Sequence, residues 1–269
     1  MSDAVDFSLD ELVGSLTVPL SGILRAWHLI KSGSYDEAKN ILLKLSAEGD
    51  SLSQFMLGEL FYNVKDYAQA HEWLNKASSN GQEEANLLLG QIYEYGHGVK
   101  LDEGIAIALY ESLALKGNST AQFLLGALYE FAQSNHQSFK RAAKWYTLAA
   151  EQGCSESQFN LALLYERGDG VDRNIETAAS WYEKAACGGL FEAQYALGCL
   201  YQNEDGSYSD KLACNSKAYK WALIANENQP EIEDVLNLIK ELEALMTDRE
   251  KDLAISEYEI WQEKSKGKA

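Results

Sequence analysis

ANLLLGQIYEYGHGVKLDEGIAIALYESLALKG, residues 85–117, is the stretch that decides the fold of this chain. Ala85, Leu89 and Tyr93 fall on one helix face because they are spaced four residues apart. A second helix carries a bulky Leu-Tyr pair and stops at Gly117, where a glycine just past the last turn is the expected left-handed cap. The stretch therefore predicts two helices joined by a turn, and neither helix can bury its apolar stripe alone.

The same pattern recurs at a fixed period. Segments that align with residues 85–90 start at residues 53, 121, 157 and 193, so successive starts along the chain lie 32, 36, 36 and 36 residues apart. A glycine ladder and an alanine ladder keep this register. Their members are Gly49, Gly81, Gly117, Gly153 and Gly189, and Ala38, Ala70, Ala106, Ala142 and Ala178. Self-similarity of this kind is typical of repeat architectures. It predicts an all-α fold, a right-handed α-solenoid of stacked helix-turn-helix repeats.

Three regions are expected along the chain. Residues 1–20 form an acidic N-terminal segment that is partly flexible, and residues 21–229 hold about six repeat units, the first of them degenerate. Residues 230–269 begin with an amphipathic pattern, and Thr247 with Glu250 three residues later reads as a capping box that opens a last helix. We expect a C-terminal pair of capping helices that seals the stack, followed by a short basic tail.

Composition argues against several classes of protein. The net charge is −18, whereas nucleic-acid binding needs clustered Lys and Arg. No stretch approaches the ~20 apolar residues of a membrane span. The N-terminus carries acidic residues before its first base, the opposite of a secretory signal. The four cysteines have no metal-type spacing, so we expect reduced thiols and a cytoplasmic location.

Three segments carry a resemblance to a known family. Residues 89–102 read LGQIYEYGHGVKLD, residues 161–174 read LALLYERGDGVDRN, and residues 142–153 read AAKWYTLAAEQG. These resemble Sel1-like repeats, which are relatives of the tetratricopeptide repeat, and the resemblance covers roughly residues 21–265. It implies a helical solenoid with a concave groove, while the family shares an architecture rather than one task. The units depart from the pattern in the loops 131–138 and 202–210, where individual contacts are expected.

The resemblance also implies which residues line the groove. They lie at the outward positions and the end of the first helix of each unit. The candidates for partner binding are Phe55, Glu59, Tyr62, Gln91, Glu94, Tyr95, Glu130, Phe131, Glu166, Arg167 and Gln202. Two readings stay open for the column Glu94, Glu130 and Glu166, namely a solvated helix face or an acidic, aromatic-lined groove for a basic peptide or domain. A second column at the outward positions contains the aromatic residues Phe55, Phe123, Phe159 and Tyr195, which either face the groove or pack between neighbouring repeats.

The remaining aromatic ladder belongs to the scaffold. We assign to the core the residues Tyr93, Tyr129, Tyr165, Trp145 and Trp181. Aromatic side chains that recur at the repeat spacing are expected to pack between helices before they bind anything. These positions are therefore kept apart from the candidates for partner binding.

No catalytic or cofactor-binding motif emerges from the chain. The four histidines are not paired at helical spacing, and His97 stands between two glycines at a variable position of the interhelix turn. There is no phosphate-binding loop and no nucleophile elbow. We therefore expect no enzyme, no cofactor and no metal. The function predicted is that of a scaffold or adaptor, monomeric or weakly self-associating, that binds a protein or peptide with a basic surface. The alternative is an immunity protein that neutralises a bacterial toxin.

Overall fold

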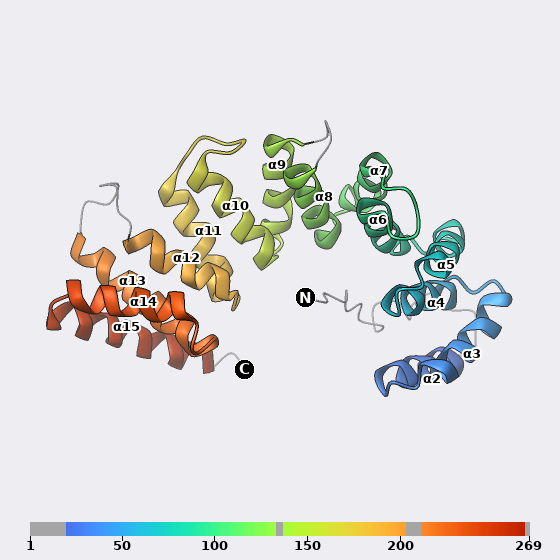
Figure 1. Cartoon of the computed structure of the whole chain (residues 1–269), viewed down its shortest axis with the longest axis horizontal. Coiled ribbons are helices and arrows are strands. Elements are labelled where there is room, and N and C mark those ends of the chain that lie inside the picture. The colour runs from blue at the N-terminus through green and yellow to red at the C-terminus, as the bar shows by residue number, and fades with distance from the viewer. Residues whose placement is uncertain (1–19, 133–136, 203–210, 267–269) are drawn as a thin grey trace. The chain divides into compact units, whose positions relative to one another are not determined.

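The computed structural model describes residues 20–132, 137–202 and 211–266, and every regular element in these ranges is an α-helix (Figure 1). The described residues form two compact units that divide between Lys116 and Gly117. Nearly all of the acidic N-terminal segment, most of the 202–210 loop and the middle of the 131–138 loop lie outside the described residues, as do the last three residues of the basic tail. No described helix is long and apolar enough to cross a membrane.

The first unit contains three helical hairpins. Its helices are α2 (Leu20–Lys31), α3 (Tyr35–Ala47), α4 (Ser51–Asn63), α5 (Tyr67–Ser79), α6 (Ala85–Tyr95) and α7 (Glu103–Ala114). Each helix packs against the next along the chain, and α4 also contacts α6. Leu57 and Leu74 are fully buried where α4 meets α5. Consecutive hairpins thus share one apolar core, as the repeat pattern predicts.

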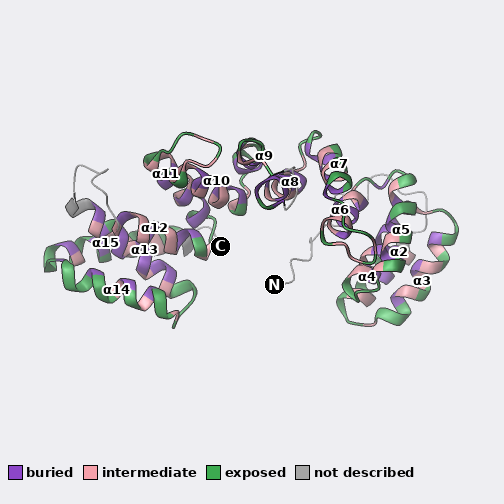
Figure 2. Cartoon of the chain, turned by 45° about the horizontal axis from the view of Figure 1, so that its top comes forward, coloured by how far each residue is buried: buried purple, intermediate pink, exposed green. Residues whose placement is uncertain are grey.

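The second unit continues the hairpins and ends in two additional helices. Its helices are α8 (Ser119–Phe131), α9 (Phe139–Glu151), α10 (Ser155–Arg167), α11 (Ile175–Cys187), α12 (Phe191–Gln202), α13 (Lys211–Asn228), α14 (Glu233–Leu245) and α15 (Asp248–Lys266). Helix α14 packs on α12 and α13, and α15 packs on α13. In both units the buried residues follow the sides of the helices that face their neighbours (Figure 2). The all-α repeat architecture is therefore confirmed.

Small residues allow the two helices of a hairpin to approach closely. The ring of Tyr110 lies against Gly90, and the ring of Tyr146 lies against Gly126, where an added Cβ would come within 2.7 Å of the ring. Tyr110, Tyr146 and Tyr182 are completely buried. The deepest aromatic in these hairpins is thus the second residue of the bulky pair in the second helix.

The aromatic residues predicted to form the core divide into two groups. Tyr129 and Trp145 are each 5% exposed, as expected for core residues. Tyr93, Tyr165 and Trp181 are only half-buried. Tyr165 and Trp181 nevertheless pack against the core cluster of the second unit, and the Tyr93 hydroxyl lies 2.9 Å from His71 Nε2, so these three rings belong to the scaffold without being fully buried.

Helix ends follow the capping residues that the sequence supplies. The backbone N–H of Ile105 donates to Asp102 (3.0 Å), and that of Thr177 donates to Asn174 (2.8 Å). Asp102 and Asn174 occupy the same position of the repeat motif, and each caps the second helix of its hairpin. At the last helix, Thr247 N–H donates to Glu250 Oε2 (2.6 Å) and Glu250 N–H donates to Thr247 Oγ1 (3.4 Å). This reciprocal pair is the predicted capping box.

One glycine turn fixes the contact between successive repeats. Gly168 ends α10 in the left-handed conformation (φ +80°), and its N–H donates to the Leu164 carbonyl (2.8 Å). Gly170 (φ +73°) lies against the start of α9 in the preceding repeat. A Cβ there would be 2.5 Å from the Lys140 backbone nitrogen and closer still to the carbonyl carbon of Phe139. The second glycine of the motif is therefore required for two backbones to touch.

Candidate functional site

The glutamate column predicted to line the groove is bound within its own repeats. Each glutamate accepts a hydrogen bond from the hydroxyl of the tyrosine sixteen residues later, on the second helix of the same hairpin. The pairs are Glu94–Tyr110 (2.8 Å), Glu130–Tyr146 (2.8 Å) and Glu166–Tyr182 (2.6 Å). A charge-assisted bond of this kind is stronger than a neutral one. The glutamate column therefore joins the two helices of each hairpin. The sequence analysis did not predict this structural role.

Two of the predicted groove residues are not on the surface. Glu130 is 5% exposed and Phe55 is 2% exposed. Phe55 packs in the apolar cluster of the first unit, and Glu130 is held by Tyr146. The expectation that these two side chains present an open surface is wrong, because helix packing covers that face of α4 and α8.

Burial changes the protonation of Glu130. Desolvation raises the pKa of its carboxyl, while the Tyr146 hydrogen bond and the charge of Arg167 lower the pKa to a smaller extent. Arg167, which is exposed at the end of α10, therefore lies near enough to Glu130 to affect its charge. The net upward shift means that the charged form is disfavoured in the folded chain.

The substitution Glu130→Gln is expected to raise the free energy of unfolding at pH 7 by about 1 kcal/mol, the order of the free-energy difference between protonation states that a shifted carboxyl pKa represents. Glutamine still accepts the Tyr146 hydroxyl but carries no charge into the buried site. Because the folded-state pKa of Glu130 is raised, its contribution to stability is greatest below the unfolded pKa and is lost as the pH rises through the folded pKa.

The gain should therefore shrink as the pH falls below the unfolded pKa. Urea unfolding at a series of pH values measures this, with Glu151→Gln, an exposed residue of the neighbouring helix α9, as the matched control. A Glu130→Gln protein that is less stable at pH 7 would contradict the expectation.

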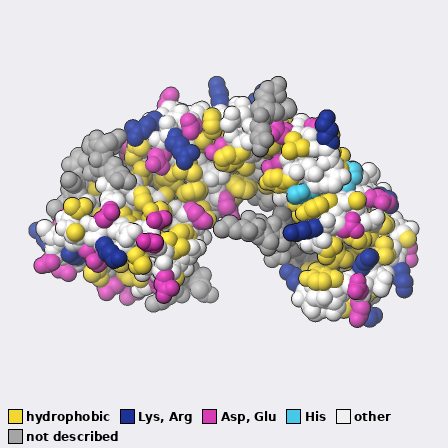
Figure 3. Space-filling model, viewed as in Figure 1, with side chains coloured by type: hydrophobic (Ala, Val, Ile, Leu, Met, Phe, Trp, Pro, Cys, Tyr) yellow, Lys and Arg dark blue, Asp and Glu magenta, His cyan; other side chains and the backbone are white. Residues whose placement is uncertain are grey.

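A half-exposed apolar strip crosses two repeats of the second unit. We call it the α10–α12 face, and it consists of Phe159, Leu163, Tyr195 and Cys199. All four are partly buried against the core cluster of this unit. The ring of Phe159 lies 5.6 Å from that of Tyr182, centroid to centroid. Hydrophobic side chains gather over α10 and α12 in the space-filling view (Figure 3).

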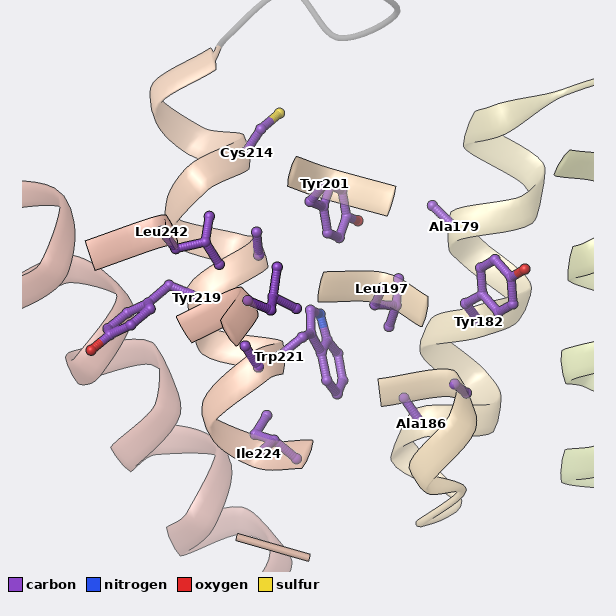
Figure 4. Close-up of a cluster of buried hydrophobic side chains, with 14 of the residues drawn as sticks. Ala179, Tyr182, Ala186, Leu197, Tyr201, Cys214, Tyr219, Trp221, Ile224 and Leu242 are labelled. Atoms are coloured by element: carbon purple, nitrogen blue, oxygen red, sulfur yellow. The ribbon is translucent and has the colours of Figure 1, made fainter. Parts of the chain in front are cut away.

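The core beneath the α10–α12 face is closely packed. Leu197, Tyr201 and Trp221 are between 0% and 4% exposed and lie between α11 and α13 (Figure 4). Tyr182 and Leu242 belong to the same cluster. The face is therefore supported by a close-packed interior and can present its half-exposed side chains without rearrangement.

Carboxylates surround one end of the α10–α12 face. Burial raises the pKa of the Cys199 thiol, and the charges of Glu166, Asp234 and Glu241 raise it further. These three groups therefore lie close to the strip. The predicted residue Gln202 donates to Glu241 of α14 (2.9 Å). Glu166, Asp234 and Glu241 therefore give this end of the strip an acidic rim.

The first unit contains an aromatic cluster that sequence reasoning only partly identified. We call it the tyrosine–histidine cluster, and it consists of Tyr62, Tyr67, Tyr95 and His97. The rings of Tyr67 and His97 are stacked, with centroids 4.2 Å apart and planes 8° apart. Tyr62 lies edge-on to Tyr67 (5.5 Å), and Tyr95 lies 5.6 Å from His97. Of these four, the sequence predicted Tyr62 and Tyr95 as binding residues, whereas Tyr67 and His97 were missed.

The other candidates lie at separate places. Glu59 and Gln91 are half-buried on α4 and α6, and Phe131 is 69% exposed at the end of α8. In the first unit the structure brings Glu94 next to Tyr62 and Tyr95, since its charge raises the pKa of both hydroxyls in addition to the larger effect of burial. Among the described residues, no group of three His, Cys, Asp or Glu side chains could hold a metal ion.

Comparison with protein families gives five matches to one repeat. A model of the Sel1 repeat matches residues 51–82, 83–118, 119–154, 155–190 and 191–229. The matched segments coincide with the hairpins that start at α4, α6, α8, α10 and α12. No curated protein matches the chain.

Solved structures supply three comparisons. A protective antigen present in uropathogenic Escherichia coli strains and displaying an SLR fold is 28% identical to this chain, with a TM-score of 0.74. The alignment covers 91% of this chain and 53% of the antigen, so this chain spans about half the length of the antigen. A Sel1 repeat protein from Oxalobacter formigenes is 24% identical with a TM-score of 0.64, covering 92% of this chain and all of the other. An immunity protein from Pseudomonas aeruginosa is 17% identical over 91% of this chain and 89% of its own, with a TM-score of 0.46, which is too low to support an argument.

Proposed function

Because the chain belongs to the Sel1 repeat family, whose scaffold typically serves protein–protein interaction, we propose that it is a cytoplasmic, non-enzymatic adaptor that docks a basic, partly apolar segment of a protein partner on the α10–α12 face. The observation that carries the proposal is the combination of half-exposed Phe159 and Tyr195 with an acidic rim on α14. This combination is found on neighbouring repeats of a single compact unit.

The chemistry of the face favours a cationic partner. Aromatic side chains at the centre of an interface concentrate binding energy. The charges around them steer the approach of the partner and favour a partner of opposite charge. Asp234 and Glu241 are exposed, so they remain hydrated until the partner arrives. Lys and Arg of a partner would neutralise this rim while an apolar side chain covers the ring of Phe159.

The test reverses two charges that take no part in the Glu–Tyr hydrogen bonds of the hairpins. The double variant Asp234→Lys/Glu241→Lys should weaken capture of the native partner about tenfold or more, which corresponds to ~1.4 kcal/mol. The readout is quantitative affinity capture from the native cell, followed by calorimetry with the purified partner. The expected losses should be larger at low salt than at high salt, because surface charges are screened.

The matched control is Glu37→Lys/Glu48→Lys, which reverses two exposed carboxylates of the first unit. It changes the net charge by the same amount, so an unchanged affinity separates local recognition from a general charge effect. Undiminished binding of the same partner to the α14 variant would remove the α10–α12 face as the docking site.

An immunity role is the alternative function that the sequence allows. The weak likeness to immunity proteins does not favour it. The measured affinity distinguishes the two functions, since an inhibitor should bind one partner at nanomolar Kd or tighter and an adaptor several partners at micromolar Kd.

A further inference from the structure

The tyrosine–histidine cluster is built by contact between two successive repeats. Tyr67 is the first residue of α5, and His97 lies in the turn that follows α6 in the next repeat. Gly98 (φ +71°) in that turn lies so close to α5 that an added Cβ would be 3.1 Å from Tyr67 Cβ. The turn is therefore seated on the first turn of α5, which holds the stacked Tyr67 and His97 rings in place.

The cluster remains accessible although it is ordered by packing. Tyr95 is 58% exposed, and Tyr62, Tyr67 and His97 are half-buried. Ring faces carry a negative quadrupole, so a group of rings at the surface attracts cations. A partly exposed set of four rings, fixed by a close-packed turn, is a suitable receptor for a flat cationic group.

A carboxylate adds charge to this ring surface. Glu94 precedes Tyr95, and its Oε2 accepts the Tyr110 hydroxyl (2.8 Å). Tyr95 also forms a side-chain hydrogen bond with Glu94; burial raises the pKa of this carboxyl, and the bonds from Tyr110 and Tyr95 lower it to a smaller extent. A carboxylate has about four lone-pair sites, so these two bonds leave capacity for further donors. The hydrogen bond with Tyr95 places the carboxylate beside the rings, and its charge raises the pKa of Tyr62 and Tyr95 in addition to the larger effect of burial.

We propose that Tyr62, Tyr95, His97 and Glu94 bind the guanidinium group of an arginine side chain from a protein partner. A guanidinium is planar, stacks on aromatic faces and donates to carboxylates in a fork, whereas an ammonium is a strongly hydrated point charge. The site belongs to the first unit, whereas the α10–α12 face belongs to the second. This inference rests on the proposed function in one respect, because it assumes that the arginine belongs to a protein partner.

The test uses a small probe, so that it needs no identified partner. N-acetyl-arginine amide is titrated into the full chain while the tyrosine and histidine ring signals are followed by NMR. We expect saturable shifts at Tyr62, Tyr95 and His97, and no such shifts with N-acetyl-citrulline amide, which has a similar shape but no charge. The variant Tyr95→Ala should weaken the probe about two- to fivefold, the scale of one exposed cation–ring contact.

The matched control is Tyr35→Ala, which removes another half-exposed tyrosine of the same unit (50% exposed, at the start of α3) and should leave the affinity unchanged. Equal shifts with the citrulline compound, tighter binding of tetramethylammonium, or an unchanged affinity in Tyr95→Ala would each overturn the arginine site. Failure here leaves the charge-reversal test of the α10–α12 face intact, so the two proposals fail separately.

Discussion

Replacing Tyr146 with alanine is expected to lower the free energy of unfolding by about 3–5 kcal/mol, the range for removing a large buried aromatic side chain. Tyr146 is completely buried, its ring lies against Gly126, and its hydroxyl binds Glu130. The substitution leaves a cavity between α8 and α9 and also removes the donor for a buried carboxylate. Equilibrium unfolding in urea, followed by helical circular dichroism, measures the loss.

The variant Tyr146→Phe separates these two effects. It keeps the ring and removes only the hydroxyl, so the expected loss is about 1–3 kcal/mol, the cost of leaving a buried acceptor without its donor. In the double variant Tyr146→Phe/Glu130→Leu the acceptor is removed as well, and part of the loss should be recovered. A loss below about 1 kcal/mol in Tyr146→Ala would show that the hairpin does not depend on this side chain.

The repeat fold could be predicted because its signals are periodic and local. Three ladders share the same steps, one of 32 and three of 36 residues, and the capping residues before the second helices and the glycines after them agree with these ladders. Such agreement between the repeat pattern and the local helix signals specifies one structure. The Glu–Tyr bonds could also have been predicted. Tyr110, Tyr146 and Tyr182 repeat at the same step as the three glutamates. What the sequence analysis did not predict is that each glutamate pairs with the tyrosine sixteen residues later.

The binding surfaces could be predicted less well, because they depend on contacts that periodicity does not specify. The position of Tyr62 and Tyr95 at helix ends follows from the sequence, but the stacking of Tyr67 on His97 joins residues thirty apart from different repeats. Likewise, Phe55 and Phe159 occupy the same repeat position, yet Phe55 is buried and Phe159 is half-exposed. The repeat pattern alone therefore does not fix how far this position is buried.

Replacing Gly170 with alanine should destabilise the second unit by about 2–5 kcal/mol. The left-handed conformation at φ +73° costs an L-residue about 1–2 kcal/mol. The new Cβ would also overlap the backbone at Phe139 and Lys140, and overpacking of this kind typically costs a further 1–3 kcal/mol. A side chain could rotate away from such an overlap, but two packed backbones cannot, so the turn between α10 and α11 must lift from α9.

Gly153→Ala provides the matched control for this prediction. Gly153 is also left-handed (φ +94°), but nothing lies within 4 Å of the position that its Cβ would take. The loss of stability in Gly153→Ala should therefore be limited to the conformational cost of about 1–2 kcal/mol. Urea unfolding of both variants gives the difference, which measures the contact between successive repeats. If Gly170→Ala loses no more stability than Gly153→Ala, the glycine serves the turn alone, and the close approach of the two repeats contributes nothing to their coupling.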